Sequence, residues 1–222
     1  MNVCVYGASS ASLADIYYME AEKLGRLLAQ RGHRLVFGGG KHGLMGSVAL
    51  GAWMERGEIL GIAPKFFDEP DVLFENCTDF IYTTTMRERK QLMEDRSEAV
   101  IVLPGGIGTY EEFFEIYTLK QLGRHHKPIV IFNINGYFDH MLATLRHTVD
   151  EKFMQASCLT LYTVATDPQQ VLDCLTVSES AATIMILHLV KACIFRKELR
   201  EMLRCAECIK ICKYDITLYM TR

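Results

Sequence analysis

Short apolar runs rich in β-branched residues alternate with longer amphipathic stretches over most of this chain. This alternation is typical of a parallel β-sheet covered by helices on both faces. The predicted strands are seven short runs: Val3–Tyr6, Leu35–Phe37, Ile59–Ile62, Phe80–Tyr82, Ala99–Leu103, Ile129–Phe132 and Leu161–Val164. The predicted helices occupy the longer stretches: Leu13–Gln30, Leu44–Glu55, Met86–Asp95, Tyr110–Leu122, Phe138–Phe153 and Pro168–Leu175. The sequence therefore predicts an α/β fold with a Rossmann-like, doubly wound parallel sheet, whose ligands bind at the carboxyl ends of the strands.

Composition excludes several classes of protein. Half of the 222 residues are hydrophobic and 23% are charged, which is not typical of a chain that is disordered over most of its length. The formal net charge of −3 gives no electrostatic basis for binding nucleic acid. A small phosphorylated ligand remains compatible with this charge, because backbone amides bind phosphate without a net positive charge.

The chain shows no signal for a membrane or for secretion. The first residues lack the basic flank and long apolar stretch of a secretory signal. The longest apolar tract, Ala181–Phe195, is interrupted by His188 and Lys191, so no uncharged run of 18 residues occurs. We therefore expect a cytoplasmic protein, in which most of the eight irregularly spaced cysteines are free, buried thiols.

A glycine-rich segment, Gly38–Gly46, follows the second predicted strand. It contains the pattern G-x-G-x-x-G through Gly38, Gly40 and Gly43. However, the segment follows the second strand and not the first, and no acidic residue lies at the end of the next predicted strand. Both features argue against a dinucleotide-binding site, and His42 in place of Ser or Thr argues against a Walker A loop. The segment is either a loop that approaches a ligand or a tight strand-to-helix turn.

A second segment, Pro104–Glu112, follows the apolar strand predicted at Ala99–Leu103. Its glycines let the chain curl, and Thr109 is predicted to begin a helix whose amides form an anion site suited to a phosphate. Thr109 and Glu112 also fit the capping box T-x-x-E, so Glu112 is either a helix cap or a functional carboxylate.

A third segment, Met86–Met93, carries Arg89 and Lys90 near the start of a predicted helix. Cations at this end oppose the helix macrodipole, which favours an anionic ligand as the reason for their position. The alternative is a solvated charged face on which Lys90 and Glu94 form an ordinary i,i+4 pair.

Together, the three segments closely resemble the LONELY GUY (LOG) family of cytokinin-activating phosphoribohydrolases. The family pattern P-G-G-x-G-T-x-x-E matches Pro104–Glu112, the pattern G-G-G-x-x-G-L-M-G matches Gly38–Gly46, and the R-K pair matches Arg89-Lys90. The resemblance covers roughly residues 1–175. It implies a Rossmann-like homodimer that hydrolyses a nucleoside 5′-monophosphate, without a metal or organic cofactor, to a free base and ribose 5-phosphate. AMP and the cytokinin riboside 5′-monophosphates are both candidate substrates.

The resemblance also implies roles for individual residues. Arg89 and Glu112 are the expected catalytic pair. The expected substrate contacts are Lys90, Gly105, Gly106, Gly108, Thr109, Thr118, Gly39, Gly40 and Met86. In such a site a carboxylate stabilises the positive charge that develops on the sugar and orients water, while a guanidinium, which stays protonated, acts electrostatically. Arg87 stands where relatives commonly have histidine. A rival interpretation is a carrier protein of the same fold that binds a nucleotide or cofactor without turnover.

A change of rhythm near Ser178 divides the chain into two predicted parts. Residues 1–177 are expected to form the nucleotide-binding catalytic domain. Residues 178–222, outside the resemblance, hold eight Lys/Arg and five Asp/Glu, a net charge of +3, and are expected to form a helical extension of unknown role, or one that binds a partner. Its three cysteines, Cys205, Cys208 and Cys212, fit one face of a helix better than a zinc site, which needs four ligands.

Overall fold

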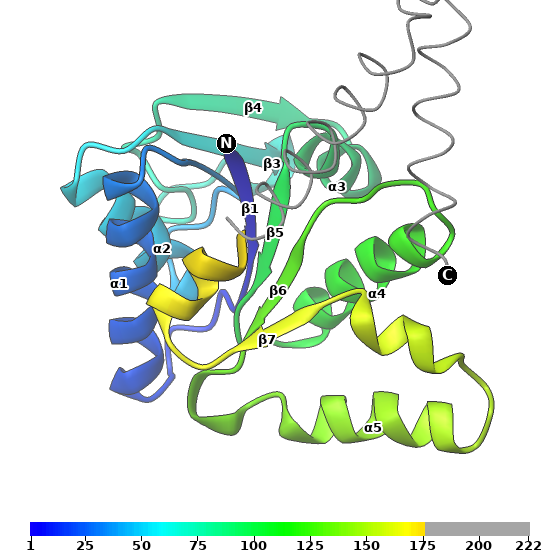
Figure 1. Cartoon of the computed structure of the whole chain (residues 1–222). Coiled ribbons are helices and arrows are strands. Elements are labelled where there is room, and N and C mark those ends of the chain that lie inside the picture. Colours follow the sequence, from blue (N-terminus) through cyan, green and yellow to red (C-terminus); the bar gives the residue numbers. More distant parts are fainter. Residues whose placement is uncertain (176–222) are drawn as a thin grey trace, which may run out of the picture. The chain divides into compact units, whose positions relative to one another are not determined.

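A computed structural model describes residues 1–175 as seven parallel strands with helices on both faces of the sheet (Figure 1). The strand order is β4-β3-β2-β1-β5-β6-β7. The strands are β1 (Asn2–Tyr6), β2 (Arg34–Phe37), β3 (Ile59–Pro64), β4 (Asp79–Thr83), β5 (Ala99–Val102), β6 (Ile129–Phe132) and β7 (Thr163–Ala165). The helices are α1 (Asp15–Gln30), α2 (Gly43–Met54), α3 (Met86–Asp95), α4 (Ile107–Gln121) and α5 (Asp139–Asp150), and residues 168–175 are also helical.

Alternate residues of the central strands face two separate hydrophobic cores. Val3 and Val5 of β1 belong to the core that α1, α2 and residues 171–175 complete. Cys4 and Tyr6 belong to the core completed by α3, α4 and α5. Because successive side chains of a strand point to opposite faces, the continuous apolar run of β1 is what a sheet covered on both sides requires.

Helices α1 and α2 pack so closely that each needs a glycine where they cross. A Cβ atom on Gly25 of α1 would lie 2.0 Å from the carbonyl oxygen of Val48, and one on Gly51 of α2 would lie 2.0 Å from that of Glu22. The two backbones therefore touch directly, and side chains larger than hydrogen are excluded at both positions.

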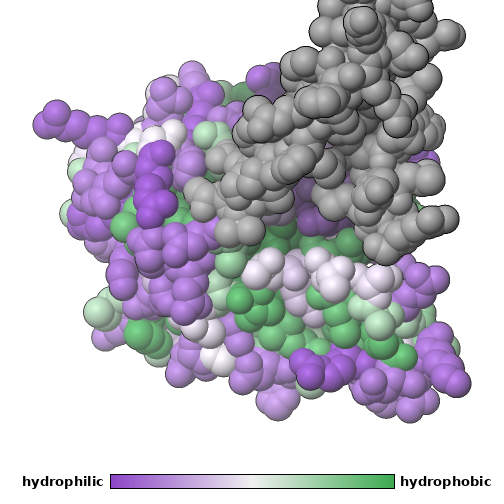
Figure 2. Space-filling view, viewed as in Figure 1, coloured by the Kyte–Doolittle hydropathy of each residue, from purple (hydrophilic) through white to green (hydrophobic). Residues whose placement is uncertain are grey.

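The surface above these cores is mixed in character. In the view of Figure 2, hydrophilic side chains dominate the outer faces, and apolar side chains gather between β7 and α5. Partly buried residues that pack against the second core include Leu142 of α5, Leu159 and Leu161.

The predicted fold class and all seven predicted strands are confirmed. Several boundaries differ by two or three residues from the sequence-based expectation, and helix α5 ends at Asp150, three residues before Phe153. Helix α4 begins at Ile107, before Thr109, and the predicted last strand is shortened because a 3₁₀ turn, Ala156–Thr160, runs up to Leu161.

The four cysteines within residues 1–175 are all free, and no helix in this part of the chain is long and apolar enough to cross a membrane. The predicted extension, with Cys205, Cys208 and Cys212, lies outside the described residues.

Candidate active site

Three loops meet at the carboxyl ends of the central strands, next to the point where the strand order reverses between β1 and β5. Ala8, just after β1, joins them. Its amide donates to the Pro104 carbonyl at 3.0 Å, and its own carbonyl accepts the Leu44 amide at 2.8 Å. The segments after β2 and β5 are therefore both hydrogen-bonded to the loop after β1.

The loop after β2 is a tightly held strand-to-helix turn. Gly39 and Gly43 have φ values of +76° and +65°, which L-residues with side chains rarely adopt. The Gly39 carbonyl accepts the Phe74 amide at 2.9 Å, and Gly40 forms an isolated bridge with Leu73. These contacts explain the shape of the turn. That Gly39 and Gly40 also contact a ligand stays a prediction.

The loop after β5 is packed on one side and open on the other. A Cβ atom on Gly105 would lie 2.1 Å from the Thr109 hydroxyl oxygen, and the Gly105 carbonyl accepts the Tyr137 hydroxyl at 2.7 Å. By contrast, Gly106 and Gly108 have nothing within 4 Å of the position that a Cβ would take. These residues are the N-cap and the second residue of α4, and residues 106–108 are exposed, so the start of this helix lies at the surface.

Helix α3 begins with a variant of the capping box, which the sequence did not lead us to expect. The Thr85 hydroxyl accepts the Glu88 amide at 3.2 Å, and the Glu88 carboxylate accepts the Thr84 amide at 2.7 Å. These bonds hold the first turn of α3 in place, and Arg89 follows directly after Glu88.

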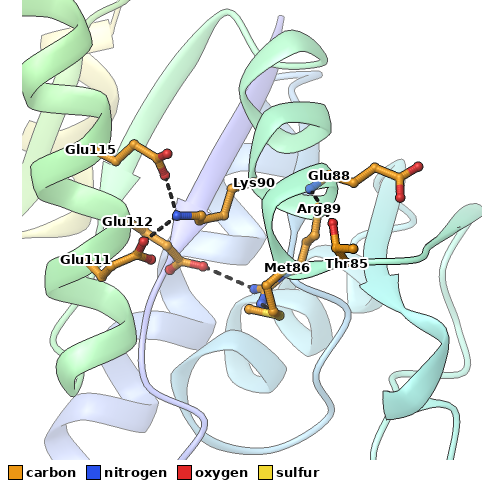
Figure 3. Close-up of polar contacts among 8 residues, drawn as sticks. All are labelled: Thr85, Met86, Glu88, Arg89, Lys90, Glu111, Glu112 and Glu115. Carbon is orange, nitrogen blue, oxygen red and sulfur yellow. Dashed lines mark hydrogen bonds and ion pairs between the residues drawn. The ribbon is translucent and has the colours of Figure 1, made fainter.

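Arg89 and Glu112 form a buried pair between α3 and α4 (Figure 3). Arg89 Nη2 donates to Glu112 Oε1 at 3.2 Å, and the two residues are only 6% and 7% exposed. Arg89 Nη1 contacts the Met86 sulfur at 3.7 Å, whereas the buried Nε has no hydrogen-bond partner.

The capping alternative for Glu112 is wrong. The N-cap of α4 is Gly106 and forms no side-chain cap, so Thr109 is the third residue of the helix and Glu112 the sixth. Since a capping box needs the acid at the third position, Glu112 cannot close one with Thr109. Its carboxylate points toward Arg89 instead.

Burial controls the protonation of this carboxylate. Removal from water raises the pKa of Glu112 from 4.5 to about 7, and the Arg89 guanidinium opposes the increase. A carboxyl group that titrates near neutral pH can accept or release a proton during a reaction.

Lys90, the neighbour of Arg89, points to a different place. Its ammonium binds Glu111 and, at 2.8 Å, Glu115 on the side of α4 (Figure 3). The side chain is only 13% exposed, and its partners are not Glu94, so the solvated face with a Lys90–Glu94 pair is wrong. A phosphate bound by Lys90 would have to share it with two carboxylates.

A cleft of about 440 Å³ opens between α3 and α4. Tyr6, Lys90, Glu112 and Glu115 are among its lining residues. Tyr6, at the carboxyl end of β1, was not among the predicted site residues, although it is the one aromatic residue of the predicted strand Val3–Tyr6. Thr118 is exposed on α4 and does not line this cleft.

The fold and the site together define a Rossmann-like α/β protein with a ligand-binding edge and a buried arginine–glutamate pair. The chain matches the family model described as "Possible lysine decarboxylase" over residues 45–175. This match and the relatives below show that it belongs to the LOG phosphoribohydrolase family.

Two curated relatives illustrate the similarity. A probable cytokinin riboside 5′-monophosphate phosphoribohydrolase of Oryza sativa subsp. japonica is 36% identical over 170 residues, which cover 77% of this chain and 81% of the relative. A cytokinin riboside 5′-monophosphate phosphoribohydrolase of Mycobacterium tuberculosis is 41% identical over 157 residues, covering 71% of this chain and 83% of the relative.

Solved structures show the same fold at lower identity. The molybdenum cofactor carrier protein of Chlamydomonas reinhardtii superposes with a TM-score of 0.60 at 22% identity, covering 82% of this chain and 98% of that chain. The molybdenum cofactor binding protein of Rippkaea orientalis has a TM-score of 0.60 at 20% identity, with coverages of 79% and 94%. These likenesses concern the architecture alone.

Proposed function

We propose that this protein is a phosphoribohydrolase. It cleaves the N-glycosidic bond of a purine nucleoside 5′-monophosphate, AMP or a cytokinin riboside 5′-monophosphate, and releases the free base and ribose 5-phosphate. The observation that carries this proposal is the buried Arg89–Glu112 pair, 3.2 Å apart, held beside the first turn of α4. Curated relatives with the same named activity support it over most of the chain.

In the proposed mechanism, Glu112 acts on the sugar. Cleavage builds positive charge on C1′ and O4′, which a nearby carboxylate stabilises, as in the hydrolysis of glycosides. Water adds to C1′ while the electrons of the C1′–N bond leave with the base. Glu112 takes a proton from this water as the C1′–O bond forms. The departing nitrogen takes a proton from solvent, and Glu112 later returns its own proton to solvent, so that one water molecule is consumed and the carboxylate is restored. The pKa of about 7 matches this task near neutral pH.

Arg89 supplies charge and position in this mechanism. A guanidinium does not give up its proton at working pH, so Arg89 is an electrostatic stabiliser and holds Glu112 in place. Removal of Arg89 is therefore expected to lower turnover as well.

The 5′-phosphate is proposed to bind at the beginning of α4, where Gly106 and Gly108 carry no side chain and leave room beside the start of the helix. The contacts with the phosphate are remote from the scissile bond, and their binding energy holds the ribose in position against Glu112. The proposed substrate contacts are those expected from the family pattern: Lys90, Gly105, Gly106, Gly108, Thr109, Thr118, Gly39, Gly40 and Met86. A homodimer, also expected from the family, is a proposal that the mass of the purified protein in solution tests.

The decisive experiment is incubation with AMP, cytokinin riboside 5′-monophosphates and other nucleotides, assayed for free base and ribose 5-phosphate. Glu112→Gln keeps an oxygen that can accept from Arg89, so this variant should remain folded and bind nucleotide. We expect its kcat to fall by on the order of 10²-fold or more. Near-normal turnover would remove Glu112 from the mechanism, and a stable nucleotide complex without base release would favour the carrier interpretation.

A further inference from the structure

Gly38 follows β2 directly, and its backbone does not explain why it is a glycine. The neighbouring Gly39 has a φ of +76°, and Gly43 one of +65°, whereas Gly38 is not among the residues with positive φ. An alanine could adopt the backbone conformation at this position without strain. The reason for the missing side chain must therefore lie in what surrounds it.

The side chain of Arg89 lies directly against Gly38. A Cβ atom on Gly38 would lie 2.1 Å from Arg89 Nη2, 2.9 Å from Cζ and 3.3 Å from Nε, and these are its three nearest neighbours. Nη2 is also the atom that donates to Glu112 Oε1 at 3.2 Å. The guanidinium thus occupies the volume that a side chain at position 38 would need.

We propose that Gly38 is a positioning residue for the catalytic pair. Its bare backbone forms the surface on which the Arg89 guanidinium lies, and from this position Nη2 reaches the Glu112 carboxylate. The catalytic consequence of this contact rests on the proposed phosphoribohydrolase function, whereas the contact itself does not.

The two glycines that follow serve different neighbours. A Cβ atom on Gly39 would lie 2.7 Å from the Phe80 ring, and one on Gly40 would lie 3.2 Å from the end of the Met45 side chain. Gly38 is therefore the one glycine of this triplet whose missing side chain would have Arg89 as its nearest neighbour.

Gly38→Ala should therefore disturb the site more than the fold. Real Cβ contacts essentially never fall below 3.0 Å, so the 2.1 Å approach has to open by about 1 Å. The atoms in the way are the far end of a flexible side chain, so the guanidinium moves and the backbone stays. A displacement of this size at a reacting site can cost about 10²-fold in rate, and we expect kcat to fall by that order.

The pH dependence of the same variant gives a readout that a purely structural role would not move. Arg89 lowers the pKa of Glu112 against the effect of burial. When the guanidinium moves away, the pKa of Glu112 rises further, so the acid limb of kcat/KM should shift to higher pH.

A double-mutant cycle tests the contact directly, with the wild type, Gly38→Ala, Arg89→Ala and the double variant compared by thermal unfolding. We expect Gly38→Ala to lower the Tm in the wild-type background but not in the Arg89→Ala background, where the new methyl group enters vacated space. The kcat loss should follow the same pattern, with no further decrease in the double variant. If Gly38→Ala alone fails to fold, recovery of folding in the double variant is the expected rescue. Equal Tm losses in both backgrounds would overturn the proposal.

This design separates the two proposals. Thermal unfolding needs no turnover, so an additive cycle in an active enzyme contradicts only the role of Gly38. A coupled cycle in a protein that hydrolyses no nucleotide supports the contact and contradicts only the proposed function.

Discussion

The Arg89 guanidinium and the Glu112 carboxylate come from different helices, yet they meet with only 3.2 Å between Nη2 and Oε1. Both side chains are 8% exposed, so each charge has lost most of its water. A buried ion pair contributes little net stability, because the cost of removing two charges from water offsets their attraction. The pair is therefore better explained by chemistry than by folding, and its properties can be tested.

The first prediction concerns the pH profile of the reaction. Since the pKa of Glu112 is raised to about 7 and the proposed mechanism needs the ionised form, kcat/KM should increase as pH rises through about 7. Steady-state kinetics with AMP between about pH 5 and about pH 9 measure this limb. An acid limb at the ordinary glutamate value would contradict the assignment of Glu112 as the base.

The second prediction concerns stability. Glutamate in the unfolded chain loses its proton near 4.5, whereas Glu112 in the folded protein keeps it until about 7. Between these values the folded state binds more protons, so the free energy of unfolding of the wild type falls as pH rises.

Glu112→Gln removes this dependence. We expect the variant to gain stability relative to the wild type between about pH 5 and about pH 8, by up to about 3 kcal/mol. Urea unfolding of both proteins at the two pH values gives the comparison. A difference that does not change with pH would show that the buried carboxyl group has an ordinary pKa.

The third prediction separates two kinds of glycine in the loop after β5. At Gly105 a methyl group would lie 2.1 Å from the Thr109 hydroxyl and 2.9 Å from the Ala8 amide nitrogen, so Gly105→Ala should destabilise the fold. At Gly108, inside α4, a methyl group meets nothing within 4 Å. Gly108→Ala should stabilise the protein by up to about 1 kcal/mol, because alanine is the better helix former.

The same methyl group at position 108 would stand in the space proposed for the phosphate. We therefore expect Gly108→Ala to raise KM for the nucleotide while the protein becomes more stable. Unfolding curves and KM for AMP, measured on both variants, check the contrast. An unchanged KM for Gly108→Ala would mean that the phosphate binds elsewhere.

The fourth prediction concerns Lys90. Its ammonium pairs with Glu111 and Glu115 and forms no hydrogen bond with Glu112. If it also holds the phosphate, Lys90→Met should raise KM by about tenfold, the value of one modest ionic contact, with a smaller loss of kcat than Arg89→Ala.

Glu115→Gln is the matched control for Lys90. It removes one competing carboxylate and keeps the lysine, so KM should not rise. If both variants raise KM equally, Lys90 serves to hold α3 against α4, and its proposed contact with the phosphate is wrong.

The pattern T-x-x-E occurs twice in this region, and only the structure distinguishes the two occurrences. In Thr85-Met86-Arg87-Glu88 it caps the start of α3, with the Glu88 carboxylate bonded to the Thr84 amide in place of the Thr85 amide. In Thr109 to Glu112 the same spacing lies inside α4, whose N-cap is Gly106. The position at which a helix begins decides the role of the pattern, and here it depends on how the loop after β5 packs on its neighbours.

Arg89 and Lys90 show a similar limit of sequence-based reasoning. The opposition of both cations to the helix dipole predicted an anionic ligand, which stays a prediction, whereas the partners in the structure are carboxylates of α4. Which partners they have depends on the position of α4, because successive residues of α3 point in different directions. Arg89 meets Glu112, and Lys90 meets Glu111 and Glu115.

The amino-acid sequence by itself determined the sheet, the alternation of helices and the family, because apolar periodicity and the spacing of glycine and proline are local signals that need no neighbours. The tertiary structure alone decided that residues 23 positions apart form one buried pair, and that Gly38 leaves room for the guanidinium. The physical reason is that burial, and with it the pKa of Glu112, depends on how α3 and α4 lie against the same edge of the sheet.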